Sequence, residues 1–184
     1  MRKKILIALA VLAVLLLAFA GVVAMQPAEY RVARSAVIAA PATIVFPFVN
    51  DFHNWEGWSP WARLDPAAVV KFDGPAWGPG AKFAWSGNAK VGEGRMTLVE
   101  SRAGEKIRIK VEFTRPMAGE TASEFAFIDD RGRTAVTWSM HGANNFIARA
   151  VCLFMDMDRM LGGDLEKGLA QLKSAAEAAA AAKK

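Results

Sequence analysis

Hydrophobic and polar residues alternate in several segments of the middle of the chain. From Lys106 to Val111, lysine or arginine at even positions alternates with isoleucine or valine at odd positions. Strand side chains point alternately to two faces, so this pattern predicts an antiparallel sheet with one buried and one solvated face. The same period, interrupted by glycine-rich or Asp-rich turns, predicts strands over residues 30–39, 67–73, 81–87, 91–101, 105–115, 120–128 and 133–141.

Apolar spacing of three and four residues replaces this alternation in two regions. Residues 41–52 are expected to form a short helix distorted by Pro47. After Gly142, apolar residues from Phe146 to Leu172 form one stripe, which predicts a single helix of about seven turns. Gly162 and Gly163 are expected to bend this helix. The alanine-rich end at 175–182 has only alanine to bury, so it is expected to fray.

These elements together predict an α+β fold. A sheet with one wet face must cover its other face, and the long C-terminal helix is the only element large enough to do so. We therefore expect a curved antiparallel sheet wrapped around the long C-terminal helix, with a space between them that both line.

The N-terminus has a different pattern, because residues 5–25 contain no charge and follow the basic residues Arg2 to Lys4. At 1.5 Å per residue this stretch spans about 30 Å, enough to cross a membrane. The basic residues predict a cytoplasmic N-terminus and a periplasmic or other extracytoplasmic domain. Alternatively, Ala18-Phe-Ala20 fits a signal-peptide cleavage pattern, which would make the protein secreted.

The net charge of +5 arises at the two ends of the chain. Three basic residues precede the apolar stretch and two end the chain, so residues 5–182 carry 18 basic and 18 acidic residues. A nucleic-acid partner is therefore not expected, since binding one requires a basic patch on the folded part. Cys152 is the sole cysteine, and no Cys/His spacing suggests zinc. No metal site or cofactor is expected.

Side chains able to do chemistry are few. His53 lies among the closely spaced Trp55, Trp58 and Trp61, a segment that either plugs the core or forms the lip of a pocket. His141 is out of phase with the apolar positions of its strand and is expected to face solvent. Asp156 and Asp158 would lie on different sides of a helix, as one solvated and one capping or arginine-paired carboxylate. No phosphate loop, nucleophile elbow or metalloprotease motif is present, so no catalytic residue is assigned.

Several segments resemble the START-like, or SRPBCC, helix-grip superfamily. They are Arg-Ser-Ala-Val-Ile-Ala-Ala-Pro-Ala-Thr-Ile-Val-Phe (34–46), Gly-Arg-Met-Thr-Leu-Val-Glu-Ser (94–101), Thr-Trp-Ser-Met (137–140), and Asn144-Asn-Phe through Leu-Phe-Met-Asp-Met-Asp (153–158) to Leu-Glu-Lys-Gly-Leu-Ala-Gln-Leu (165–172). They are similar to the membrane-tethered bacterial branch described as polyketide cyclase/dehydrase or lipid-transport-like. The resemblance implies a hydrophobic cavity between the sheet and the last helix. It divides the chain into an anchor or signal segment with its linker (1–28), a START-like domain (29–176) and an Ala/Lys-rich tail (177–184).

The preferred hypothesis is a membrane-tethered binding module for a hydrophobic small molecule or lipid. The residues expected to line its pocket are Trp55, Trp58, Trp85, Met96, Ile109, Val111, Phe125, Trp138, Met140, Phe154, Met157 and Met160. The alternatives are a cyclase/dehydrase-like enzyme, which needs two ionisable side chains inside the cavity, and an envelope interaction scaffold that meets a partner through its tryptophans.

Overall fold

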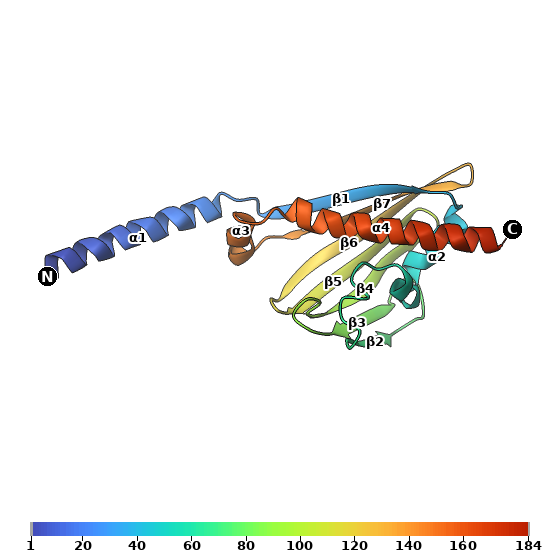
Figure 1. Ribbon diagram of the computed structural model, residues 1–184, viewed down its shortest axis with the longest axis horizontal. Coiled ribbons are helices and arrows are strands. Elements are labelled where there is room, and N and C mark those ends of the chain that lie inside the picture. Colours follow the sequence, from blue (N-terminus) through green and yellow to red (C-terminus); the bar gives the residue numbers. More distant parts are fainter. Residues whose placement is uncertain (1, 184) are drawn as a thin grey trace.

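The computed structural model describes residues 2–183. An N-terminal helix projects from a domain in which a long helix lies along a curved sheet (Figure 1). The elements in chain order are α1 (Arg2–Ala24), β1 (Glu29–Ile38), α2 (Ala42–Asn50), the 3-10 helix η1 (Phe52–Gly57), β2 (Val69–Asp73), β3 (Lys82–Ser86), β4 (Glu93–Arg102), β5 (Lys106–Arg115), β6 (Gly119–Asp130), β7 (Arg133–Ala143), α3 (Phe146–Cys152) and α4 (Met157–Ala182).

All seven strands form one antiparallel sheet in the order β1-β7-β6-β5-β4-β3-β2. Strands β2 to β7 follow one another as neighbours, and β1 closes against β7 from Glu29 opposite Ala143 to Ile38 opposite Thr134. The seven predicted strands are confirmed, with ends that differ by at most two residues. The alternating pattern sufficed here because each strand buries one face only.

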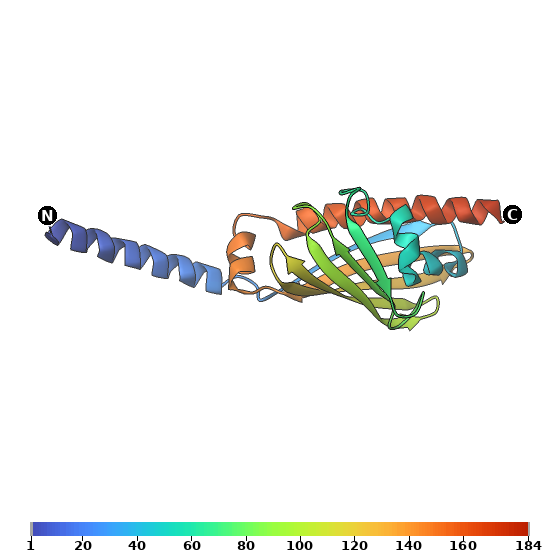
Figure 2. The same ribbon diagram turned by 90° about the horizontal axis from the view of Figure 1, so that it is seen from below.

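Helix α4 covers the concave face of the sheet, as the helix-grip prediction required (Figure 2). Leu165, Leu169 and Leu172 recur at helical spacing and are at most 2% exposed, so they form the side of α4 that packs on the sheet. Helix α4 contacts β1 most extensively, and it also contacts α2 and η1. The core therefore lies between α4, the concave face and the α2–η1 segment.

The prediction of one continuous helix after Gly142 is wrong. The structure has two helices, α3 and α4, separated by residues 153–156. Asp156 takes an extended conformation and its side chain accepts a hydrogen bond from the backbone N–H of Arg159 at 3.0 Å. An aspartate in this position satisfies an N–H group at a helix start, so it favours a new helix over continuation of the old one. The apolar periodicity spanned the break and concealed it.

The prediction that the alanine-rich end of α4 frays is also wrong. The helix passes through Gly162 and Gly163 without interruption and continues to Ala182 instead of fraying. Ala176 is fully buried, and Glu177 accepts a hydrogen bond from the backbone N–H of Ala39 at 2.7 Å. Contacts with the far end of β1 thus stabilise an alanine-rich segment that has little apolar surface of its own.

The convex face of the sheet carries paired charges. Lys106 forms an ion pair with Glu124 at 3.0 Å, and Lys110 forms one with Glu120 at 2.9 Å. Arg95 donates to Glu112 at 2.8 Å across β4 and β5. The alternating basic residues of β5 therefore belong to a solvated face on which basic and acidic side chains lie opposite one another.

Candidate functional site

Two tryptophans, one within η1 and one directly after it, fill the space between the sheet and α4. Trp55 and Trp58 are 4% and 1% exposed, and their indole nitrogens donate to the backbone oxygens of Val49 and Phe48 at 3.1 and 2.8 Å. The Trp58 ring meets Trp138 of the sheet edge-to-face at a centroid distance of 5.7 Å. Of the two interpretations of this segment, the structure shows the plug for Trp55 and Trp58.

The predicted pocket residues fall into two groups. Eight are buried in the core that surrounds the plug, namely Trp55, Trp58, Met96, Ile109, Val111, Phe125, Trp138 and Met140. Trp85 is half-buried on the same concave face. The remaining three lie around the start of α4, where Phe154 is 81% exposed, Met160 is 49% exposed and Met157 is half-buried. The structure therefore brings nine of the twelve together and leaves the last three apart.

Polar groups on the concave face are satisfied by one another. The indole nitrogen of Trp138 donates to the Ser123 hydroxyl at 2.8 Å. The Tyr30 hydroxyl donates to Thr121 at 2.7 Å, and Thr121 in turn donates to the backbone oxygen of His141. Within residues 2–183, the buried polar side chains are Asn, Ser and Thr, with no ionisable one. Such a surface offers a ligand apolar contact and demands no hydrogen bond in return.

Half-exposed aromatic side chains surround the concave face near the end of the sheet that adjoins α1. We call Tyr30, Trp61, Trp85 and Phe113 the aromatic rim. Tyr30 lies near the start of β1, while Trp85 and Phe113 lie near the ends of β3 and β5 and contact each other edge-to-face at 5.8 Å. Trp61 follows η1, packs edge-to-face on Trp138 at 5.6 Å and donates to Asp164 of α4.

Gly94 sets the position of Trp85. A Cβ atom added to Gly94 would lie 2.6 Å from the Trp85 ring and 2.5 Å from the Glu112 backbone oxygen. Only glycine therefore lets the indole lie across β4. An open groove of about 960 Å³ runs over the ends of β2 to β6, and it is lined by Trp85 and Phe113 together with the convex-face side chains Arg95, Glu112 and Glu120.

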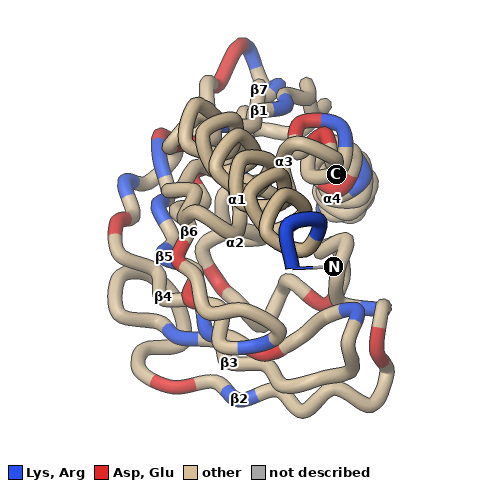
Figure 3. The backbone as a smooth tube through the Cα atoms, turned by 90° about the vertical axis from the view of Figure 1, so that its left-hand side faces the viewer, with Lys and Arg blue, Asp and Glu red and all other residues tan. Residues whose placement is uncertain are grey.

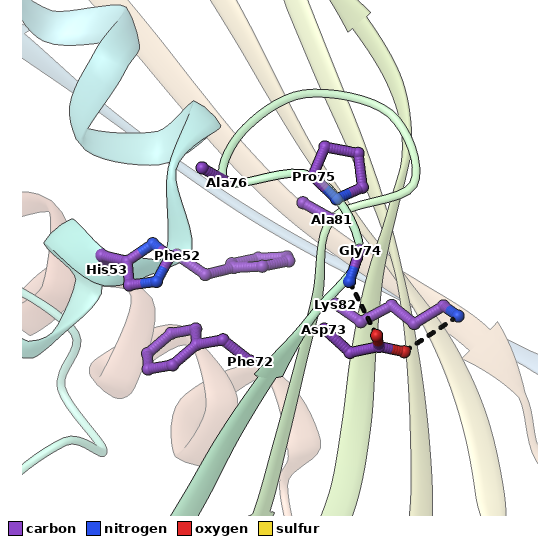
Figure 4. Close-up of a pocket in the computed structure, with 9 residues that line it drawn as sticks. All are labelled: Phe52, His53, Phe72, Asp73, Gly74, Pro75, Ala76, Ala81 and Lys82. Carbon is purple, nitrogen blue, oxygen red and sulfur yellow. Dashed lines mark hydrogen bonds and ion pairs between the residues drawn. The ribbon is translucent and has the colours of Figure 1, made fainter.

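A smaller pocket of about 250 Å³ lies at the other end of β2 and β3, beside η1 (Figure 4). His53 stacks on Phe72 there at a centroid distance of 4.0 Å, and its Nδ1 lies 2.7 Å from the Asp51 carboxylate. Lys82 pairs with Asp73 at 3.4 Å on the opposite side of the pocket. Sequence reasoning identified His53 but missed Asp51, although an acidic residue two positions away was a visible signal. The pair has the arrangement in which a carboxylate orients an imidazole.

The other candidate side chains have structural partners. Asp156 caps α4, and Asp158 accepts two hydrogen bonds from Arg34, at 2.9 and 3.0 Å, which lower the pKa of this carboxyl. Arg34 also donates to Glu166 at 2.6 Å, so it joins β1 to two turns of α4. The sequence analysis did not identify Arg34. Arg34 lies two residues after Val32 in β1 and therefore faces the same, concave side of the sheet, which could have indicated a role in contact with α4.

A Cβ atom at Gly162 would overlap the Arg34 guanidinium, so alanine there would force this side chain to shift and would disturb the ion-pair network. His141 alternates with Met140 toward the convex face, as predicted, but its side chain is half-buried rather than open to solvent. Its Nδ1 atom has no hydrogen-bond partner in the described part of the chain.

Comparison with known proteins places this geometry in a family. Residues 29–177 match the family model described as "Polyketide cyclase / dehydrase and lipid transport". No curated protein shows significant similarity in sequence.

Solved structures that resemble the domain include three of bacterial origin. Protein CV1439 from Chromobacterium violaceum is 18% identical, with a TM-score of 0.56, and the match covers 82% of this chain and 99% of that one. The Zhui aromatase/cyclase from Streptomyces sp. R1128 is 16% identical, with a TM-score of 0.56 and coverage of 81% and 94%. The Aha1 dimer from Colwellia psychrerythraea is 14% identical, with a TM-score of 0.58 and coverage of 80% and 96%. At these identities the likeness concerns the fold alone.

Proposed function

Because this chain belongs to the polyketide cyclase/dehydrase and lipid-transport family, we propose that it is a membrane-tethered binding module for a hydrophobic small molecule or lipid. The ligand enters at the aromatic rim and lies on the concave face, on the α1 side of Trp58. The observation that carries this proposal is the pairing of half-exposed rim aromatics with a floor whose polar groups already bond to one another.

The floor beneath the rim is formed by Met96, Val111 and Met140, which are at most 9% exposed. Thioether side chains adapt to ligands of different shape, since they are unbranched and polarisable. Trp55 and Trp58 close the deeper part of the space, so a long ligand would have to displace η1 or extend outward past the rim. The rim position therefore suits an elongated apolar molecule bound by one end.

Helix α1 supports the tether. Among residues 2–183 it is the one helix long and apolar enough to cross a membrane, a test that a signal sequence also passes. Its apolar side chains are exposed, and its basic residues gather at the N-terminus (Figure 3), which is the end of α1 away from the domain (Figure 1). Such a helix is stable in a bilayer but not in water. Cleavage after Ala20 is the alternative, and it would release a soluble binding protein.

The proposal is tested with the full chain in liposomes that contain a diazirine-labelled fatty acid. After irradiation, peptide mass spectrometry should find label on the floor strands β5 and β7 as well as on α1. The α1 label serves as an internal control, because it reports lipid contact that does not depend on the pocket. Label confined to α1 would refute binding by the domain, and absence of label from α1 would refute the tether.

A pair of tryptophan variants locates the site. Trp85→Ala removes a rim aromatic, whereas Trp77→Ala removes a side chain that is 67% exposed in the 74–80 loop. Losing about 60 Å² of indole contact weakens binding by about 1.5 kcal/mol, or roughly tenfold. Trp85→Ala should therefore reduce labelling of β5 and β7 by about that factor while Trp77→Ala leaves it unchanged. Equal labelling in both variants would show that the ligand does not bind at the aromatic rim.

The enzyme alternative is favoured by one observation, the Asp51–His53 pair at the smaller pocket. A cyclase or dehydrase would use such a pair as a general base. Under the binding proposal, His53→Ala leaves fatty-acid labelling of the floor strands unchanged. The scaffold alternative is disfavoured, because the nearly complete burial of Trp55 and Trp58 leaves only Trp61 of that segment for a partner.

A further inference from the structure

An unpartnered apolar surface lies at the junction between α1 and the domain. We call it the α3 patch, and it consists of Phe146, Ile147, Val151, Phe154 and Met155, which are 53%, 59%, 37%, 81% and 44% exposed. Helix α3 has no buried residue, so it contributes nothing to the domain core. Five large apolar side chains gathered in ten residues on a surface indicate a site of interaction with a partner or a membrane.

The position of the α3 patch relative to α1 is set by hydrogen bonds. Arg149 of α3 donates to the backbone oxygen of Ala24, which ends α1, and to that of Asn144 at 3.1 Å. The Asn144 side chain donates to Pro27 at 3.2 Å, and its backbone N–H donates to Ala28 at 2.7 Å. Val23 is the buried residue of α1, because α3 packs against this end of the helix.

Charge also favours a membrane as the partner. The sequence has no acidic residue between Asp130 and Asp156, and the only charge within α3 is Arg149. The Arg149 side chain turns toward the end of α1, so the patch itself is uncharged. A helix of this kind next to a candidate membrane span is suited to lie at the boundary between headgroups and acyl chains.

From this arrangement we infer that the α3 patch inserts into the bilayer surface and is a second membrane contact beside α1. The inference rests on the proposed tether and adds an orientation to it. The aromatic rim lies at the same end of the sheet as α1 and α3, so an inserted α3 patch holds the rim against the bilayer (Figures 1 and 2). Ligand then passes between the rim and the lipid without crossing water.

The test uses environment-sensitive fluorophores on single cysteines of the full chain in liposomes. With Cys152 replaced by serine, Phe154→Cys reports the α3 patch. Ile128→Cys is the matched control, because it is 68% exposed and lies toward the β6–β7 turn at the opposite end of the sheet. Leu12→Cys reports α1. Nitroxide-labelled phosphatidylcholine in the bilayer and an aqueous quencher distinguish the two environments.

We expect lipid nitroxides to quench the probes at 154 and 12 at least threefold more than the probe at 128. Lipid quenching at 12 but not at 154 would overturn the inference and leave the tether intact. Lipid quenching at neither position would overturn both. A probe at 154 that neither quencher reaches would mean that a second copy of the chain covers the α3 patch, which also overturns the inference.

Discussion

Two glycines of α4 allow the packing of this helix to be tested quantitatively. A Cβ atom at Gly168 would lie 2.6 Å from the Trp138 ring and 3.0 Å from Pro60, whereas one at Gly163 would meet nothing within 4 Å. Trp138 cannot yield easily, since it is 1% exposed and its indole nitrogen is bonded to Ser123. Gly168→Ala and Gly163→Ala thus make the same chemical change in one helix, with different steric consequences.

The expected change in the free energy of unfolding is the sum of a helix-propensity gain and a packing cost. Replacing glycine by alanine inside a helix stabilises the protein by about 1 kcal/mol, and overpacking a core costs about 1–3 kcal/mol. Gly163→Ala should therefore raise the free energy of unfolding by about 1 kcal/mol. Gly168→Ala should change it by between about 0 and −2 kcal/mol. At about 2–4 °C per kcal/mol, the midpoints of the two variants should differ by about 2–12 °C.

The assay is thermal unfolding of the full chain in detergent, followed by tryptophan fluorescence. All six tryptophans lie between residues 55 and 138, so the signal reports the domain and not α1. If Gly168→Ala were as stable as Gly163→Ala, α4 would not pack on Trp138 as closely as the structure shows. In that case α4 would cover the concave face only loosely.

Three further predictions concern stability. Asp156→Ala removes the cap of α4 and should lower the free energy of unfolding by about 1 kcal/mol, whereas a continuous helix would gain stability from this change. Trp58→Ala should cost about 3–5 kcal/mol in chemical denaturation, and a smaller loss would show that the plug is loosely packed. The hydrogen bond from Arg95 holds the pKa of Glu112 below its ordinary value of 4.5. This stabilisation is present above pH 4.5 and is lost as the pH falls through the lowered pKa, so the melting temperature of Glu112→Gln should change less than that of the parent chain between pH 6 and pH 3.

The sequence by itself determined the strands and the broad architecture. Alternation is a local property that depends only on which side chains can face water, and β5 shows it from Lys106 to Val111. The apolar run from residue 5 to residue 25 likewise determined α1, because no polar residue within it could face solvent. These features can be predicted without knowing the tertiary contacts of each element.

Only the tertiary structure decided how the space between sheet and helix is used. The tryptophan spacing allowed either a plug or a lip, and burial of Trp55 and Trp58 against Trp138 settled it, because packing joins residues about 80 positions apart. The ion-pair partner of Asp158 could not be predicted from the sequence either, since Arg34 lies 124 residues away in the chain. The α3 patch exists because α3 ends at Cys152 and Asp156 caps the start of a new helix. The apolar spacing does not record this local hydrogen bond.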